Sequence, residues 1–223
     1  MKKYENVVWD WNGTLLDDVS AGKDTLNRML EKRQLPRLTL ESYREIFGFP
    51  VIDFYQAVGF DFQKETLHEI SVDFVDTYNR YSGQLELNPG IREVLEGLKA
   101  AGIKQYVLSA LREDLLKKIT EEFGIAGYFE HLCGSDNIYA SGKIERGERM
   151  LQAYGLHPGS TLMVGDTVHD AEVAEALGFD VVLYTGGHNS EARLREKAPV
   201  ISRFEQLLSL PEVLQASTSL VTP

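Results

Sequence analysis

The sequence predicts an α/β fold: a doubly wound parallel sheet of Rossmann-like type with an inserted α-helical cap. Three observations support this prediction. A short apolar run at residues 7–11 closes on Asn12-Gly13, as a buried strand that ends in a turn does. Residues 17–87 then have helical periodicity almost throughout. From residue 88 onward, apolar strand-like runs alternate with helical segments, which is typical of parallel strands joined by helices.

The elements after residue 88 follow in the order that such a fold requires. Asn88-Pro89 is predicted as the N-cap and first residue of a helix, and Gly102 is predicted to end that helix in the left-handed conformation. Strands are predicted at residues 103–108, 128–133, 161–164 and 181–184, and helices at residues 112–123, 144–154 and 168–177.

These elements predict two units. The α/β core comprises residues 1–16 and 88–214, and the helical cap comprises residues 17–87. The tail at residues 215–223 is rich in Ser and Thr and is expected to be flexible. Within the cap, the segment Gly48-Phe49-Pro50 is the favoured candidate for a loop that sets substrate specificity.

Composition restricts the possible functions. The 223 residues carry a net charge of −11, which argues against nucleic acid or an anionic membrane as the main partner. Cys133 is the only cysteine, so an intrachain disulfide is excluded. No run approaches the length of a membrane span, and the start has no apolar stretch typical of a signal peptide. We therefore expect a cytoplasmic protein.

Polar side chains follow the predicted strands at the points where these strands end. Asp10 leaves the first strand, Ser109 and Ala110 leave the second, and Asp166 leaves the strand at 161–164 with Asp170 one helical turn later. In an open parallel sheet, ligands bind beyond the carboxyl ends of the strands. We therefore expect these groups to meet at one edge, together with a loop lysine, Lys143.

The residue types in this cluster are suited to phosphoryl transfer. Grouped carboxylates repel one another unless a cation lies between them, and Mg²⁺ prefers oxygen ligands. An aspartate beside such a cation can attack phosphorus and form an aspartyl-phosphate. A lysine would neutralise the charge that develops. The groups predicted to bind the phosphoryl oxygens are Gly13, Thr14, Ser109, Ala110 and Lys143.

Four segments in order resemble the motifs of the haloacid dehalogenase superfamily, in its phosphoglycolate-phosphatase-like branch with a helical cap. They are Asp10-Trp11-Asn12-Gly13-Thr14-Leu15, then Ser109, then Lys143, then Gly165-Asp166-Thr167-Val168-His169-Asp170. The resemblance implies a hydrolase in which Asp10 is the nucleophile and a Mg²⁺ ligand. The backbone carbonyl of Asn12 and the carboxylate of Asp166 would be further ligands, with Asp170 in support. It also implies that the substrate is a small phosphorylated metabolite.

Asn12 departs from the family pattern. The phosphatases of this superfamily normally carry a second aspartate there, which protonates the leaving alcohol and then deprotonates the attacking water. Asn can donate and accept hydrogen bonds but cannot transfer protons in this way. We therefore expect slow turnover of alkyl esters and less impaired turnover of aryl or acyl phosphates. Partial deamidation of Asn12-Gly13 to aspartate is the alternative.

Two other functions remain open. A phosphonate-cleaving relative would need a Schiff-base lysine from the cap, for which Lys23 is the nearest candidate. A phosphate-binding regulatory protein without turnover is the second. Carbon–halogen cleavage is disfavoured because Asp166 and Asp170 are retained. His169 is interpreted as an exposed helix residue and His188 as a loop residue. A monomer or a homodimer is expected.

Overall fold

The computed structural model describes residues 4–81, 83–140 and 142–210. Within them, six parallel strands form one sheet in the order β5-β4-β1-β6-β7-β8, which confirms the predicted parallel α/β fold. Their bounds are β1 (Asn6–Trp9), β4 (Lys104–Arg112), β5 (His131–Ser135), β6 (Thr161–Gly165), β7 (Asp180–Tyr184) and β8 (Val200–Ile201).

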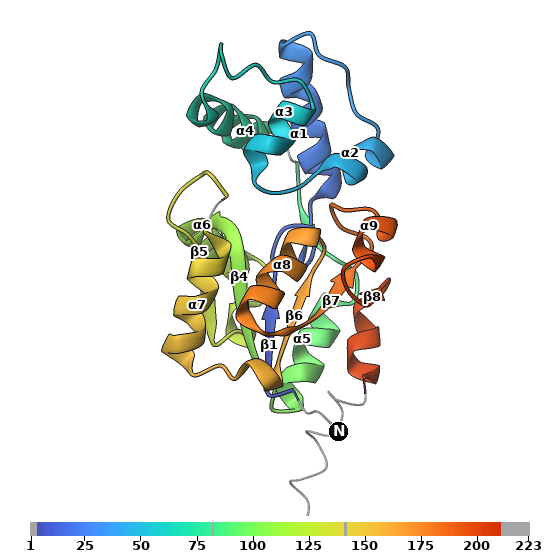
Figure 1. The fold of residues 1–223 in the computed structure, drawn as a ribbon. Coiled ribbons are helices and arrows are strands. Elements are labelled where there is room, and N and C mark those ends of the chain that lie inside the picture. Colours follow the sequence, from blue (N-terminus) through green and yellow to red (C-terminus); the bar gives the residue numbers. More distant parts are fainter. Residues whose placement is uncertain (1–3, 82, 141, 211–223) are drawn as a thin grey trace, which may run out of the picture.

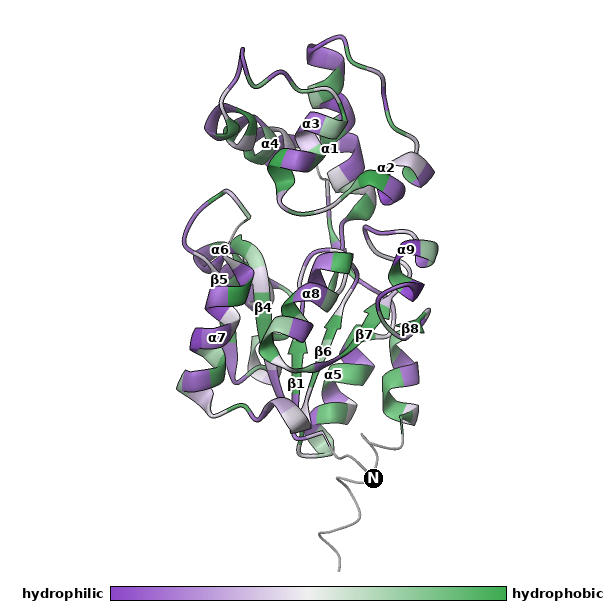
Figure 2. Cartoon of the chain, viewed as in Figure 1, coloured by the Kyte–Doolittle hydropathy of each residue, from purple (hydrophilic) through white to green (hydrophobic). Residues whose placement is uncertain are grey.

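Helices cover both faces of this sheet (Figure 1). Side chains alternate along β1, so Val7 and Trp9 join one apolar cluster while Val8 joins another. Helices α5 (Ile91–Ala100) and α6 (Glu113–Glu122) pack into the first cluster. Helices α7 (Lys143–Tyr154) and α8 (Val168–Leu177) pack into the second. The strands between these layers are coloured mainly as hydrophobic in Figure 2.

Four further helices stand beyond the carboxyl ends of the strands (Figure 1). We call them the cap helices: α1 (Val19–Lys32), α2 (Leu40–Ile46), α3 (Val51–Ala57) and α4 (Leu67–Tyr81). They bury an apolar cluster of their own, which includes Leu26, Phe54 and Ile70. A short antiparallel pair, β2 (Leu16–Asp17) and β3 (Glu86–Leu87), joins them to the sheet. The exact division into core and cap stays a prediction, and residues 215–223 lie outside the described residues.

The sequence-based prediction of the helix at Asn88-Pro89 was wrong in its start. Helix α5 begins at Ile91, after Gly90 in the left-handed conformation with φ of 80°. The Asn88 side chain instead donates to the carbonyl oxygens of Thr14 (2.7 Å) and Gly13 (3.3 Å). Asn88 therefore holds the turn after β1 in place. Gly102 does end the helix with a positive φ of 75°, as predicted.

The segment after β7 was not predicted in detail. It contains the short helix α9 (Glu191–Arg195), strand β8 and a 3-10 helix at Phe204–Ser209. The first part of this segment, residues 185–189, is rich in glycine and lies at the carboxyl edge of the sheet. It contributes to the site described below. None of the helices in the described part of the chain is both long enough and apolar enough to cross a membrane.

Candidate active site

Asp10 and Lys143 form the centre of the site. Asp10 follows directly on β1, and its backbone N–H donates to Val164 of the neighbouring β6 (2.8 Å). Lys143 is the first residue of α7, and its Nζ donates to Asp10 Oδ1 at 2.5 Å and to Asp170 Oδ1 at 2.7 Å. All three side chains are almost completely buried. In this poorly solvated site, Lys143 thus fixes one oxygen of the Asp10 carboxylate and is itself held by Asp170.

Asp170 is held by the start of its own helix. It is the third residue of α8, and Thr167 is the N-cap. Asp170 Oδ2 accepts from the Thr167 hydroxyl (2.7 Å) and from the backbone N–H groups of Thr167 and Asp166. This capping box fixes the carboxylate, so that its other oxygen faces Lys143. Asp170 therefore positions the lysine as well as contributing negative charge.

Asp166 follows directly on β6 and is fully buried. Its Oδ1 accepts from the Thr14 hydroxyl (2.7 Å), and its Oδ2 accepts from the backbone N–H of His188 (2.6 Å). Carboxylate oxygens of Asp10, Asp166 and Asp170 all lie within 4.8 Å of one another. Such a buried set of oxygen donors could hold a divalent cation of the magnesium class.

The charges in this cluster are not balanced by protein groups alone. Burial raises the pKa of Asp10 well above its ordinary value, although Lys143 opposes the shift. Burial also raises the pKa of Asp166 to about 6, partly offset by the charge of His188. Asp170 behaves differently: the lysine overcomes the effect of burial and lowers its pKa. Three carboxylates around one ammonium therefore leave a negative charge that a bound cation would stabilise.

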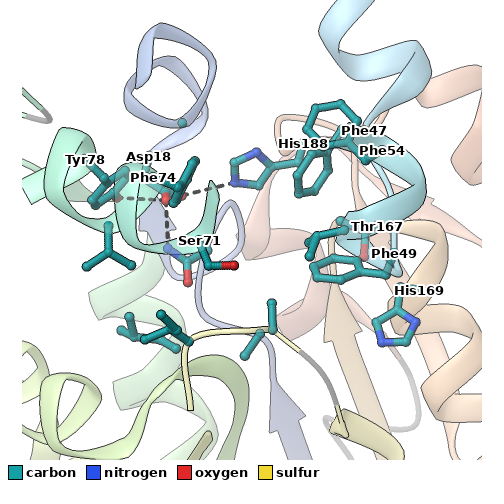
Figure 3. A pocket seen from close by; sticks show the side chains of 18 of the residues that line it. Asp18, Phe47, Phe49, Phe54, Ser71, Phe74, Tyr78, Thr167, His169 and His188 are labelled. Atoms are coloured by element: carbon teal, nitrogen blue, oxygen red, sulfur yellow. Dashed lines mark hydrogen bonds and ion pairs between the residues drawn. The ribbon is translucent and has the colours of Figure 1, made fainter. Parts of the chain in front are cut away.

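Asn12 is anchored by a further buried carboxylate, Asp18. Asn12 Nδ2 donates to Asp18 Oδ2 at 2.7 Å, and the Gly13 N–H donates to Asp18 Oδ1 at 2.7 Å. The Tyr78 hydroxyl also donates to Asp18 (2.9 Å). On the other side, His188 Nε2 lies 3.3 Å from Asp18 Oδ1 (Figure 3). The Asn12 carboxamide is thus held by a network that joins the turn after β1 to the cap.

Asp18 and His188 form an ion pair. Burial raises the pKa of Asp18, but the hydrogen bond and charge of His188 bring it below its ordinary value. Burial lowers the pKa of His188, but contact with Asp18 raises it to about 9. The imidazole is therefore protonated at neutral pH. Its Nδ1 lies 2.9 Å from the hydroxyl of Tyr43, so the pair links three separate parts of the chain.

Sequence reasoning missed both members of this pair. His188 does lie in a loop, as predicted, and its side chain is buried. Asp18 was not singled out. The available signal was the run Gly186-Gly187-His188-Asn189, which starts two residues after a strand ends at the edge where ligands bind. His169 is half-buried, and its ring lies 4.8 Å from that of Phe49.

Some residues predicted to bind phosphate have other contacts. The Gly13 N–H is occupied by Asp18 and Leu16, and the Thr14 hydroxyl by Asp166. The Ser109 hydroxyl accepts from the Leu111 N–H at 3.0 Å. For Gly13 and Thr14, phosphate binding stays a prediction, and in this structure both donors are occupied by other groups of the protein. For Ser109, phosphate binding stays a prediction.

A cavity of about 300 Å³ opens directly above the carboxylate cluster, between the sheet edge and the cap helices. Of the predicted site residues, it is lined by Asp10, Asn12, Ala110, Lys143 and Asp170. Asp18 and His188 also line it, and so does Phe49 from the expected specificity segment (Figure 3). Lys23 does not; its Nζ pairs with the adjacent Asp24 at 2.6 Å.

Comparison with known proteins gives related sequences and folds. Phosphoglycolate phosphatase from Nitrosococcus oceani is 25% identical over 223 residues, covering 96% of this chain and 98% of that protein. Tyrosine-protein kinase PtkA from Mycobacterium tuberculosis is 27% identical over 184 residues, covering 82% of this chain and 62% of that protein. A haloacid dehalogenase-like hydrolase structure from Streptococcus pneumoniae superposes with a TM-score of 0.79 at 19% identity, covering 92% and 97% of the two chains.

The family assignment agrees with the geometry of the site. The sequence model of the family of haloacid dehalogenase-like hydrolases matches residues 7–184 of this chain. This range includes Asp10, Lys143, Asp166 and Asp170. This match extends from the first strand of the sheet to the end of β7. The expected resemblance, and with it the expectation of a hydrolase similar to phosphoglycolate phosphatases, is confirmed. The chain belongs to the family of haloacid dehalogenase-like hydrolases.

Proposed function

We propose that this hydrolase is a magnesium-dependent phosphatase that acts on a small phosphorylated metabolite through an aspartyl-phosphate on Asp10. The observation that carries the proposal is the double ion pair of Lys143 with Asp10 and Asp170, at the floor of a cavity. A buried nucleophilic carboxylate with one oxygen fixed by an ammonium needs little reorganisation before it attacks phosphorus. The match to a hydrolase family and the phosphoglycolate phosphatase relatives support this choice.

The ligands proposed for Mg²⁺ are the carboxylates of Asp10 and Asp166 and the backbone carbonyl of Asn12, with Asp170 in support. The three carboxylates fit such an ion because they are buried, close together and short of positive charge. When bound, the ion would neutralise charge on the phosphoryl oxygens. Lys143 would also neutralise charge on the transferring phosphoryl group, while Asp170 keeps the ammonium in place.

In the first step a carboxylate oxygen of Asp10 forms a bond to phosphorus while the bond between phosphorus and the leaving oxygen breaks. The leaving oxygen then needs a proton. In the second step water attacks phosphorus, loses a proton and releases phosphate, which restores the Asp10 carboxylate. Asn12 cannot transfer either proton, so both steps lack the usual acid–base group at this position. The loss typically costs about 10²–10⁴ in rate.

The two alternative functions have weaker support. Cleavage of a phosphonate through a Schiff base needs a lysine in the cavity, and Lys23 pairs with Asp24 instead of lining it. A regulatory protein without turnover would have no need for the Lys143 ion pairs around a nucleophilic carboxylate. Magnesium-dependent phosphatase action therefore accounts for more of the observed geometry than either alternative.

The test measures phosphate release from a panel of alkyl and aryl phosphates in magnesium and in EDTA. We expect release that requires magnesium and falls by at least about 10³-fold in Asp10→Asn, since the variant lacks the nucleophile. The matched control is Asp53→Asn, an exposed carboxylate of α3 outside the cavity. Release that is unchanged in Asp10→Asn, or equal in EDTA, would exclude the proposal.

A further inference from the structure

The cavity above Asp10 is mainly apolar where the leaving group of a substrate would lie. Attack by Asp10 requires the leaving oxygen to be roughly in line on the far side of phosphorus. The sheet occupies the near side, so the leaving group extends away from Asp10 towards the cap helices (Figure 1). Most of the side chains that form the walls there are aromatic or aliphatic. They include Phe49, Phe54 and Phe74 from the cap and Leu111, Leu115 and Ile138 from the core.

The described residues of the cap contribute no basic side chain to this cavity. Among the described cap residues that line it, Asp18 is the only charged one, and Asn79 and Ser71 are uncharged polar groups. A carboxylate on the leaving group would therefore meet apolar walls and an anion. Burying such a charge without a partner is strongly unfavourable.

The basic side chains that the rest of the described chain adds to the cavity already have carboxylate partners. Four of them line it, and each lies within ion-pair distance of an Asp or Glu. The pairs are Lys143 with Asp10 and Asp170, Arg112 with Asp114, His169 with Glu172, and His188 with Asp18. A second anionic group there would have to share these cations with their carboxylate partners.

We propose that the substrate is a phosphate monoester with an uncharged, apolar leaving group, aromatic or branched aliphatic, rather than a carboxylate-bearing one such as glycolate. This inference rests on the phosphatase function proposed above and specifies the substrate class for the same site. It departs from what the names of the phosphoglycolate phosphatase relatives suggest. Burial of apolar surface is expected to increase affinity by about fourfold per methylene group.

The decisive kinetic comparison uses isobutyl phosphate and phosphoglycolate in magnesium. The two esters have nearly the same shape, because the two terminal methyl groups replace the two carboxylate oxygens. We expect kcat/KM to be at least about tenfold higher for isobutyl phosphate. It should also rise on the order of one hundredfold from ethyl to hexyl phosphate, which keeps the leaving alcohol's acidity nearly constant. Higher kcat/KM for phosphoglycolate, or no dependence on chain length, would overturn the inference.

A binding measurement separates this inference from the phosphatase proposal. Isobutylphosphonate and phosphonoacetate have no ester bond, and calorimetry of the magnesium-loaded protein reports their affinities without turnover. Tighter binding of isobutylphosphonate supports the apolar site even if no ester is hydrolysed, a result that would reject only the phosphatase. Tighter binding of phosphonoacetate would reject the apolar site even if esters are hydrolysed.

Variants localise the effect. Phe74 lines the cavity. Phe74→Ala should therefore reduce kcat/KM for hexyl phosphate at least fivefold more than for ethyl phosphate, because the longer chain would bury more apolar surface against this wall. Phe62→Ala is the matched control: Phe62 packs in the same cap cluster but does not line the cavity. Equal loss with both esters in Phe74→Ala would contradict the assignment of Phe74 to the binding wall.

Discussion

Asn12 donates a 2.7 Å hydrogen bond to Asp18, a carboxylate that is itself buried and paired with His188. The contact fixes the carboxamide where related phosphatases are expected to carry their proton-transferring aspartate. The side chain of Asn12 thus has a defined hydrogen-bond partner in this structure. In the mechanism proposed above, the site keeps the groups that attack phosphorus but lacks the acid–base group at this position.

The first prediction concerns Asn12→Asp. The new carboxyl group would lie against Asp18, and repulsion between like charges would raise its pKa and favour a protonated form that can donate to a leaving alcohol. We expect kcat for alkyl phosphates to rise by about 10²–10⁴-fold, and by much less for aryl phosphates, whose leaving groups need no proton. Steady-state kinetics with both ester classes provide the measurement. An unchanged rate on alkyl phosphates would reject the role given to position 12.

The second prediction concerns the pH dependence of stability. The pKa of His188 is raised from 6.5 to about 9, so its contribution is complete below about pH 6.5 and is lost as pH rises through about 9. The pKa of Asp18 is lowered from 3.8, so its contribution is complete above pH 3.8 and is lost as pH falls further. The pair therefore stabilises the fold most between about pH 4 and 6.5.

Urea unfolding at pH 6 and pH 9.5 measures this effect. Between these two values the wild type should lose about 3 kcal/mol more than Asp18→Asn, which has already lost the ion pair. The comparison cancels contributions from the other titrating groups. If both proteins lose the same free energy of unfolding, His188 does not derive its raised pKa from Asp18.

The third prediction concerns magnesium and stability. A cation that binds only the folded state stabilises it by about 2.7 kcal/mol at one hundred times its Kd. Thermal unfolding in magnesium and in EDTA should show this gain in the wild type. Asp166→Asn should remove it, because Asp166 supplies one of the three clustered carboxylates. Asp53→Asn, on the exposed side of α3, should retain it. A full magnesium effect in Asp166→Asn would place the cation elsewhere.

The fourth prediction concerns Gly13, which has a φ of +75°. A Cβ there would overlap the Asp166 carboxylate and the His188 ring. Gly102 has the same φ of +75° but open space around it, so Gly102→Ala isolates the backbone cost of roughly 1–2 kcal/mol. We expect Gly13→Ala to cost a further 1–3 kcal/mol or so and to abolish magnesium stabilisation. Equal costs in the two variants would show that the site tolerates the added methyl group.

The position of the candidate site at the carboxyl edge of the sheet could be predicted because it depends on local sequence patterns. Asp10 and Asp166 each follow a short apolar run, and parallel strands bring such positions together whatever the rest of the chain does. The start of α8 was predictable for a similar reason, since Thr167 and Asp170 form a capping box within one turn.

The Asp18–His188 pair could not be predicted from such patterns. The two residues are 170 positions apart, and His188 lies in a loop without periodicity. Their contact depends on how the chain after β7 meets the start of α1. The reassignment of Asn88 has the same origin: its side chain bonds two carbonyl groups more than 70 positions away instead of capping a helix. Contacts between distant loops are fixed by tertiary packing alone.

Direct observation of the intermediate tests the central claim. The protein is mixed with magnesium and an aryl phosphate, quenched in acid within seconds, and digested for peptide mass spectrometry. Because Asn12 should slow hydrolysis of the intermediate more than its formation from an aryl ester, we predict one phosphoryl group accumulating on Asp10, absent in EDTA. The same reaction with Asn12→Asp should show less accumulation and faster release. Turnover of the ester with Asp10 unmodified, and with Asp10→Asn fully active, would contradict the account.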